Sequence, residues 1–82
     1  MRLVDSRPQI YFRLFVKDYL ETKGRGSSKV LAKQLNIRPS YLSDLVTGKR
    51  AWSDKMKDKV MRQTNTRMSD ILRKGEFLYM LL

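Results

Sequence analysis

The chain has 82 residues, no cysteine, no histidine and a formal net charge of +10 at pH 7. Its length suits one small domain, and the missing thiol and imidazole groups exclude disulfides, thiol nucleophiles and most transition-metal sites, so we expect no enzyme, metal or cofactor. No apolar run reaches the roughly 20 residues of a membrane span, the lack of cysteine favours a cytoplasmic setting, and the excess of Lys and Arg favours a nucleic-acid partner.

The first expected helix begins at Pro8, because proline is accepted in the first turn, where its missing N–H is not needed. Apolar residues then recur with helical spacing at Phe12, Phe15, Val16, Tyr19 and Leu20. Gly24 and Gly26 end this helix. Ser27 or Ser28 is expected to cap a second helix by accepting a hydrogen bond from an early backbone N–H.

The segment Gln34–Val46 contains the point that decides the interpretation, because a helical pattern is interrupted there and then resumes. Pro39 disfavours helical geometry at Arg38, whereas Asn36 tolerates the left-handed conformation that ends many helices. The second helix therefore ends near Asn36 and a third begins at Pro39, with Gly48 after its end. The core-facing residues are Leu31, Ala32 and Leu35 before the turn and Tyr41, Leu42, Leu45 and Val46 after it.

Two further helices are expected after the loop that follows the third. Ser53 begins the fourth, Thr66 caps a short fifth, and Gly75 ends it. Their core-facing residues are Met56, Val60, Met61, Met68, Ile71 and Leu72. Trp52 is expected to be a lid on the core rather than a platform for base stacking. The pattern thus predicts an all-α fold of five short helices.

Residues 28–47 resemble the DNA-binding helix-turn-helix of the phage repressor and Cro-like family. The positions that carry this resemblance are Leu31, Ala32, Leu35, Asn36, Ile37, Leu42 and Leu45. Three positions, Gly26, Ser28 and Pro39, depart from the family pattern. The resemblance extends more weakly over residues 10–75. It implies a five-helix lambda-repressor-like domain at residues 1–76, with the helix-turn-helix formed by the second and third helices.

Such a motif places its second helix, here the third of the chain, in the major groove of DNA. The residues expected to face base edges are Pro39, Ser40, Ser43, Asp44 and Thr47. Serine hydroxyls can donate or accept hydrogen bonds, whereas Asp44 can only accept and suits cytosine N4. The alternative for the two serines and Asp44 is ordinary solvated helix surface. Asp44 has a second alternative, an ion pair with Arg38 or Lys49.

Phosphate contacts are expected on both sides of that helix, from Ser28, Lys29, Lys33, Arg38, Tyr41, Lys49 and Arg50. They are supported by the charge pattern, because no acidic residue lies between Glu21 and Asp44 while several basic residues do. The alternative is a solvated basic face. For Tyr41 the alternative is a position at the edge of the core.

Residues 77–82 form an apolar tail with the sequence Phe77, Leu78, Tyr79, Met80, Leu81 and Leu82. Such a run is unfavourable in water, and a break at Gly75 would let it cross a two-fold axis. We expect the tail to hold a homodimer, either as paired edge strands or as a continued helix. The alternative is that the tail folds back onto its own core.

The predicted function is sequence-specific binding of double-stranded DNA by a transcriptional regulator of the repressor type, from a bacterium or phage. A dimer would bind a palindromic operator, because two motifs about 34 Å apart match its half-sites. One alternative is an antitoxin-type protein that binds a toxin and regulates its own operon. Another is a helical protein-interaction adaptor. RNA binding has less support, because the chain lacks the aromatic stacking motifs of RNA-binding folds.

Overall fold

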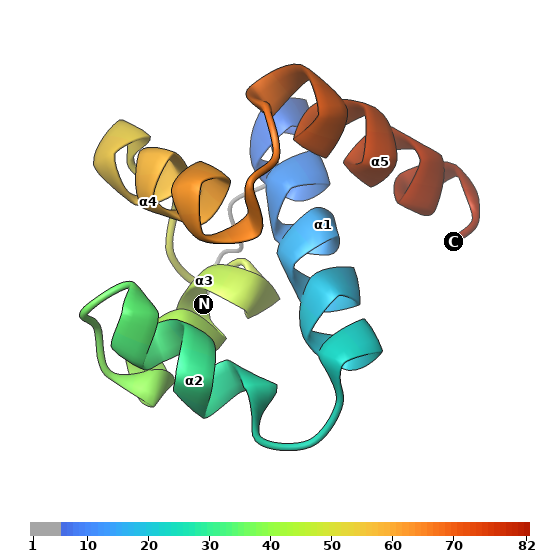
Figure 1. The fold of residues 1–82 in the computed structure, drawn as a ribbon. Coiled ribbons are helices and arrows are strands. Elements are labelled where there is room, and N and C mark those ends of the chain that lie inside the picture. Colours follow the sequence, from blue (N-terminus) through green and yellow to red (C-terminus); the bar gives the residue numbers. More distant parts are fainter. Residues whose placement is uncertain (1–5) are drawn as a thin grey trace.

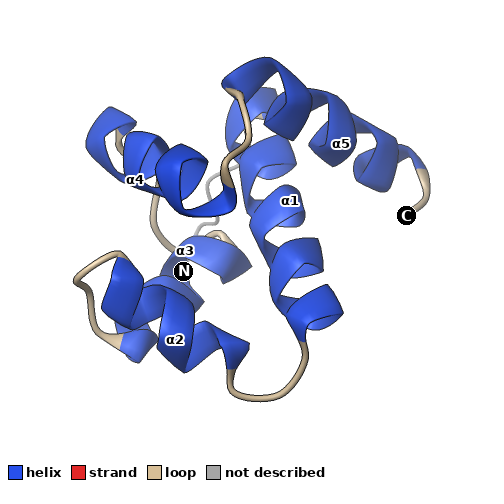
Figure 2. Ribbon diagram, viewed as in Figure 1, coloured by secondary structure: helices blue, strands red, loops and turns tan. Residues whose placement is uncertain are grey.

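The computed structural model describes residues 6–82, which form five α-helices and no strand (Figures 1 and 2). The helices are α1 (Arg7–Lys23), α2 (Ser27–Gln34), α3 (Pro39–Thr47), α4 (Asp54–Thr64) and α5 (Met68–Met80). The predicted all-α fold of five helices is confirmed for this part of the chain. The first five residues of the predicted domain 1–76 lie outside the described residues. None of the described helices has the length and apolarity to cross a bilayer.

The helices enclose one apolar core. Its buried members are Phe12, Val16, Leu31, Ala32, Leu35, Leu42, Leu45, Trp52, Val60 and Ile71. All of these were expected to be core residues from their helical spacing, apart from Trp52, which was expected to be a lid. The Trp52 ring lies 4.8 Å from the Phe12 ring, between centroids, and is 3% exposed. No polar or charged residue is buried among residues 6–82.

Helix α1 runs through the middle of the molecule, with α5 on one side and α2, α3 and α4 on the other (Figure 1). The most extensive contact between helices is that of α1 with α5, and α1 also contacts α2 and α3. The side-chain amide of Gln9 in α1 clamps the segment after α3, donating to the Trp52 carbonyl at 3.0 Å and accepting from the Trp52 N–H at 2.7 Å. Helix α1 thus supports both α3 and α5.

The turn between α2 and α3 has the conformation expected from the sequence. Asn36 is left-handed, with φ of 59°, and Arg38 is extended ahead of Pro39. The Ile37 N–H donates to the Ala32 carbonyl at 2.9 Å, which ties the turn to α2. A residue distant in sequence also stabilises this turn: Lys59 Nζ in α4 donates to the Leu35 carbonyl at 3.2 Å, a contact that no local pattern predicts. This bond satisfies a carbonyl that the end of α2 leaves without an intrahelical partner.

The expectation that Gly75 ends the fifth helix is wrong, because α5 continues to Met80. Gly75 is buried where α5 crosses α1. A Cβ at this position would lie 2.6 Å from the Cα of Tyr11 and closer still to the Tyr11 carbonyl group. Gly75 is therefore a site of close helix packing, and the predicted boundary between residues 76 and 77 falls inside α5.

Two expected caps are also corrected. Gly26 is the N-cap of α2, and the Ser27 hydroxyl instead donates to the Leu20 carbonyl at the end of α1, at 2.8 Å. The hydroxyl of Thr66 donates to the Thr64 carbonyl at 2.9 Å and does not cap α5. Both hydroxyls donate to a backbone carbonyl near the end of a helix and so cannot cap the helix that follows; the Leu20 carbonyl also accepts from the Gly24 N–H at 3.0 Å. The prediction that the fourth helix begins at Ser53 is confirmed, since Ser53 is the N-cap of α4 and its Oγ accepts from the Met56 N–H at 3.2 Å.

Candidate nucleic-acid interface

The outer face of α3 carries a stripe of small polar side chains. Ser40, Ser43 and Thr47 are exposed and Asp44 is partly exposed. Their spacing places them along one side of the helix, while buried leucines occupy the opposite side. Pro39 is exposed at the first position of this helix. The residues predicted to contact bases thus share a single solvent-facing surface.

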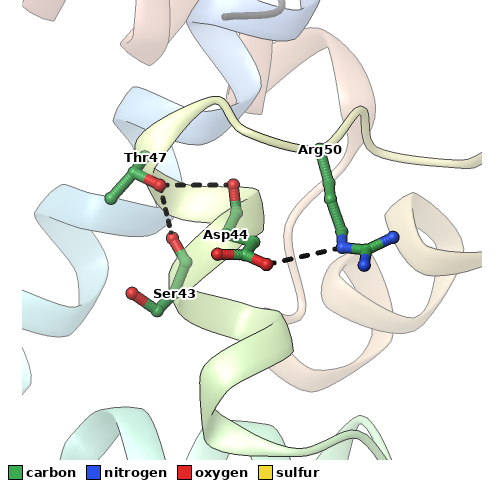
Figure 3. Close-up of polar contacts among 4 residues, drawn as sticks. All are labelled: Ser43, Asp44, Thr47 and Arg50. Atoms are coloured by element: carbon green, nitrogen blue, oxygen red, sulfur yellow. Dashed lines mark hydrogen bonds and ion pairs between the residues drawn. The ribbon is translucent and has the colours of Figure 1, made fainter. Parts of the chain in front are cut away.

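Hydrogen bonding distinguishes the hydroxyls of this stripe (Figure 3). Thr47 Oγ1 donates to the Ser43 carbonyl at 2.9 Å and lies 3.4 Å from the Asp44 carbonyl. Its proton is therefore engaged within α3, and the hydroxyl is left mainly as an acceptor. The hydroxyl of Ser43 makes no hydrogen bond to the other described residues, so it can still donate or accept.

Asp44 has a partner that the sequence analysis did not identify. Arg50 Nε lies 3.5 Å from Asp44 Oδ2 (Figure 3). The Arg50 guanidinium also lies 5.0 Å from the centroid of the Tyr41 ring. The pairing with Arg38 or Lys49 that we considered is not the one observed. Both side chains remain substantially exposed, 57% for Arg50 and 36% for Asp44, so the pair is weak.

The Arg50 contact arises from the way in which α3 ends. Gly48 is left-handed, with φ of 88°, as expected for a residue that ends a helix. The chain then folds back, and the N–H groups of Lys49 and Arg50 both donate to the Asp44 carbonyl, at 2.9 and 3.2 Å. This reversal brings the Arg50 side chain beside α3. Lys49 is exposed in the same loop.

A basic groove, which we term the α2–α3 groove, lies along α2 and the turn that follows it. Its volume is about 500 Å³, and it is lined by Lys29, Ala32, Lys33, Asn36, Ile37, Arg38 and Pro39. It thus gathers three of the predicted phosphate-contacting cations, with no acidic side chain among the lining residues. Asn36 is a lining residue that sequence analysis assigned only to the turn. Ser28 is exposed one helical turn before Ala32.

The two groups of basic residues therefore flank α3. The α2–α3 groove adjoins its first turn, and the loop with Lys49 and Arg50 follows its last turn. Tyr41 is only partly exposed and packs against the core, so its ring is at the core edge that we considered as its alternative. This arrangement offers polar groups in the centre and cations on both sides.

The predicted dimerisation residues lie in two different environments. Leu78 and Tyr79 are partly buried, and the Tyr79 ring packs edge-on against Tyr11 with 5.7 Å between centroids. The remaining apolar side chains are largely exposed: Phe77 58%, Met80 75%, Leu81 67% and Leu82 88%. Part of this segment thus folds back onto α1 as a continued helix, and part is uncovered.

Comparison of the chain with protein-family models, curated proteins and solved structures gave no match. The geometry of the candidate interface is therefore the only indication of its function. Its components are the polar stripe on α3, the α2–α3 groove and the basic loop after α3.

Proposed function

We propose that the protein binds double-stranded DNA in a sequence-specific manner and regulates transcription, with α2 and α3 acting as a helix-turn-helix. The observation that carries the proposal is the position of the α2–α3 groove. Three cations surround it, and it adjoins the first turn of a helix whose outer side chains are small and polar. A DNA duplex has phosphates along its backbone and base edges in its groove. The cations can contact the phosphates, and the polar outer face of the helix can contact the base edges.

In the proposed complex, α3 lies in the major groove and Ser40 and Ser43 face base edges. Lys29, Lys33 and Arg38 contact phosphates on one side of the helix, and the loop after Gly48 contacts phosphates on the other. Phosphate contacts would set the register of the protein, and the α3 stripe would supply specificity. Occupation of a promoter would exclude polymerase, so repression is the simplest regulatory outcome.

The proposed assembly is a homodimer in the cytoplasm of a bacterium or phage-infected cell. The uncovered apolar end of α5 lies across α1 from α2 and α3 (Figure 1), so it could be covered without blocking the DNA-binding face. The described residues measure 31 × 29 × 25 Å. Binding to a palindromic operator requires the dimer to hold its two α3 helices about 34 Å apart, one turn of DNA. An antitoxin-type protein could bind its toxin through the same apolar end of α5. An antitoxin is therefore the second candidate function.

Substitutions should separate base contacts from phosphate contacts. Ser43→Ala should alter preference at one or two base pairs by about 1–3 kcal/mol if its hydroxyl makes a good base contact. Lys33→Ala should weaken binding to all duplexes by a similar factor, because phosphates are the same in every sequence. The measurement is selection of bound sites from a random duplex pool, followed by titration of the selected site and its single-base variants. If Ser43→Ala leaves the selected sequence unchanged at every position, Ser43 does not contact a base.

The dimer can be tested with two exposed residues of the α5 end. Met80→Glu with Leu81→Glu introduces charges that a covered apolar surface would exclude, so we expect a monomer in analytical ultracentrifugation. Affinity for a palindromic duplex should fall by at least about tenfold, since one motif then binds alone. Arg73→Ala, an exposed change on the same helix, should leave the dimer intact. A wild-type protein that remains monomeric at concentrations on the order of tens of micromolar would contradict the dimer.

A further inference from the structure

A second hollow lies on the other flank of α2, and its lining shares no residue with the α2–α3 groove. We term it the α1–α2 groove. Its volume is about 470 Å³, within the usual range of ligand sites, and it is open to solvent. It lies between the last turns of α1, the loop that follows and α2. Its lining includes Tyr19, Lys23, Arg25, Val30 and Leu31.

An apolar side chain in the lining of this groove is exposed to solvent. Val30 is 58% exposed, and it is the only largely exposed large apolar residue in the described chain that lies outside residues 77–82. Single exposed apolar side chains are common and need no explanation. Val30, however, lies in a hollow beside the Tyr19 ring and the buried Leu31. Together they form a concave apolar floor on which a complementary apolar side chain would lose its contact with water.

The rim of the groove is positively charged and has no counter-charge. Lys23 and Arg25 are both exposed, and neither has an ion pair with a carboxylate of residues 6–82. Among residues 6–82, the Lys23 ammonium contacts the Tyr19 ring, 5.5 Å from its centroid, and no carboxylate. No acidic residue lines the groove. Two unpaired cations beside an apolar floor match a ligand that has carboxylates next to an apolar side chain.

We propose that the α1–α2 groove docks an acidic, amphipathic segment of a partner protein. An apolar side chain of that segment packs on Val30 and Tyr19, and its carboxylates pair with Lys23 and Arg25. A nucleic acid fits less well, because it has no aliphatic side chain to cover Val30, which is 58% exposed. The inference does not depend on DNA binding. Since the α2–α3 groove is separate, both grooves could be occupied together.

The test uses the full chain and a short fluorescein-labelled peptide in which Asp and Glu alternate with Leu and Phe. A matched peptide has Asn and Gln in place of the acids. Fluorescence anisotropy should detect binding of the acidic peptide and much weaker binding of the amide peptide. Lys23→Glu with Arg25→Glu should reduce affinity for the acidic peptide by about tenfold or more. Val30→Thr, which keeps the side-chain shape but adds a hydroxyl, should also weaken binding measurably.

The control variant is Lys29→Glu with Lys33→Glu, which changes net charge by the same amount on the other flank of α2. It should reduce peptide affinity far less than the Lys23 and Arg25 pair. Equal losses in the two variants would show non-specific attraction and overturn the proposal, as would failure of the wild-type chain to bind the acidic peptide. Backbone amide NMR shifts locate the site independently. Shifts centred on Tyr19 and Val30 with the peptide support the proposal, and the same shifts with a duplex oligonucleotide overturn it.

Discussion

Gly75→Ala should destabilise the protein, although alanine is the better residue for a helix. In the interior of a helix this change normally stabilises by up to about 1 kcal/mol. At Gly75 the added methyl would meet the backbone of Tyr11, which has no flexible end that can move aside. The crossing of α1 and α5 must then open, and overpacking of this kind typically costs about 1–3 kcal/mol. For a domain of this size, each kcal/mol lowers the melting temperature by about 4–8 °C.

The neighbouring residue provides a matched control for thermal unfolding followed by circular dichroism. Glu76 is exposed on the same helix, so Glu76→Ala should change stability by no more than about 0.5 kcal/mol. The sign of the Gly75→Ala effect is decisive. A higher melting temperature would mean that only helix propensity matters there, and that the two backbones do not come close.

The different outcomes for Asn36 and Gly75 show what local sequence can establish. The left-handed turn at Asn36 was predicted because its signals, an asparagine followed by an X–Pro pair, act within a few residues. The same kind of reasoning misassigned Gly75, because a glycine near the end of a helical pattern suggests a helix end. Its true role depends on Tyr11, near the other end of the chain, and no local pattern contains that contact. The helical spacing of the apolar residues predicted the core correctly, because the buried face of a helix recurs at every turn.

In the candidate interface, too, local sequence predicted some features and tertiary structure determined the others. Periodicity correctly placed Ser40, Ser43 and Thr47 on one exposed face of α3. It could not show that the Thr47 hydroxyl is engaged within the helix, because Thr side chains choose between solvent and a preceding carbonyl. Nor could it identify Arg50 as the partner of Asp44, since that contact requires the reversal at Gly48. Charge patterns predicted which cations were available, and tertiary structure determined which of them are already paired.

DNA affinity should fall steeply with salt. Lys29, Lys33, Arg38 and Lys49 have no ion pair among residues 6–82, whereas Arg50 is paired with Asp44. Four unpaired cations that contact phosphates give a slope of about −3.6 in log K against log salt. Affinity would then drop by about 150-fold between about 50 and 200 mM salt. The measurement is a titration of duplex DNA at several salt concentrations, and a binding constant that does not change with salt would contradict phosphate contact.

Single substitutions show which residues contribute to the slope of log K against log salt. Lys33→Ala should make it shallower by about 0.9, whereas Lys55→Ala, an exposed change on α4 outside the interface, should leave it unchanged. Asp44→Asn is the most informative change, because it releases Arg50 without altering side-chain shape. If Arg50 then contacts a phosphate, the slope should steepen by about 0.9 and non-specific affinity should rise. An unchanged slope would mean that Arg50 contacts no phosphate even when it is released from Asp44, and that its role is confined to the Tyr41 ring and the loop after α3.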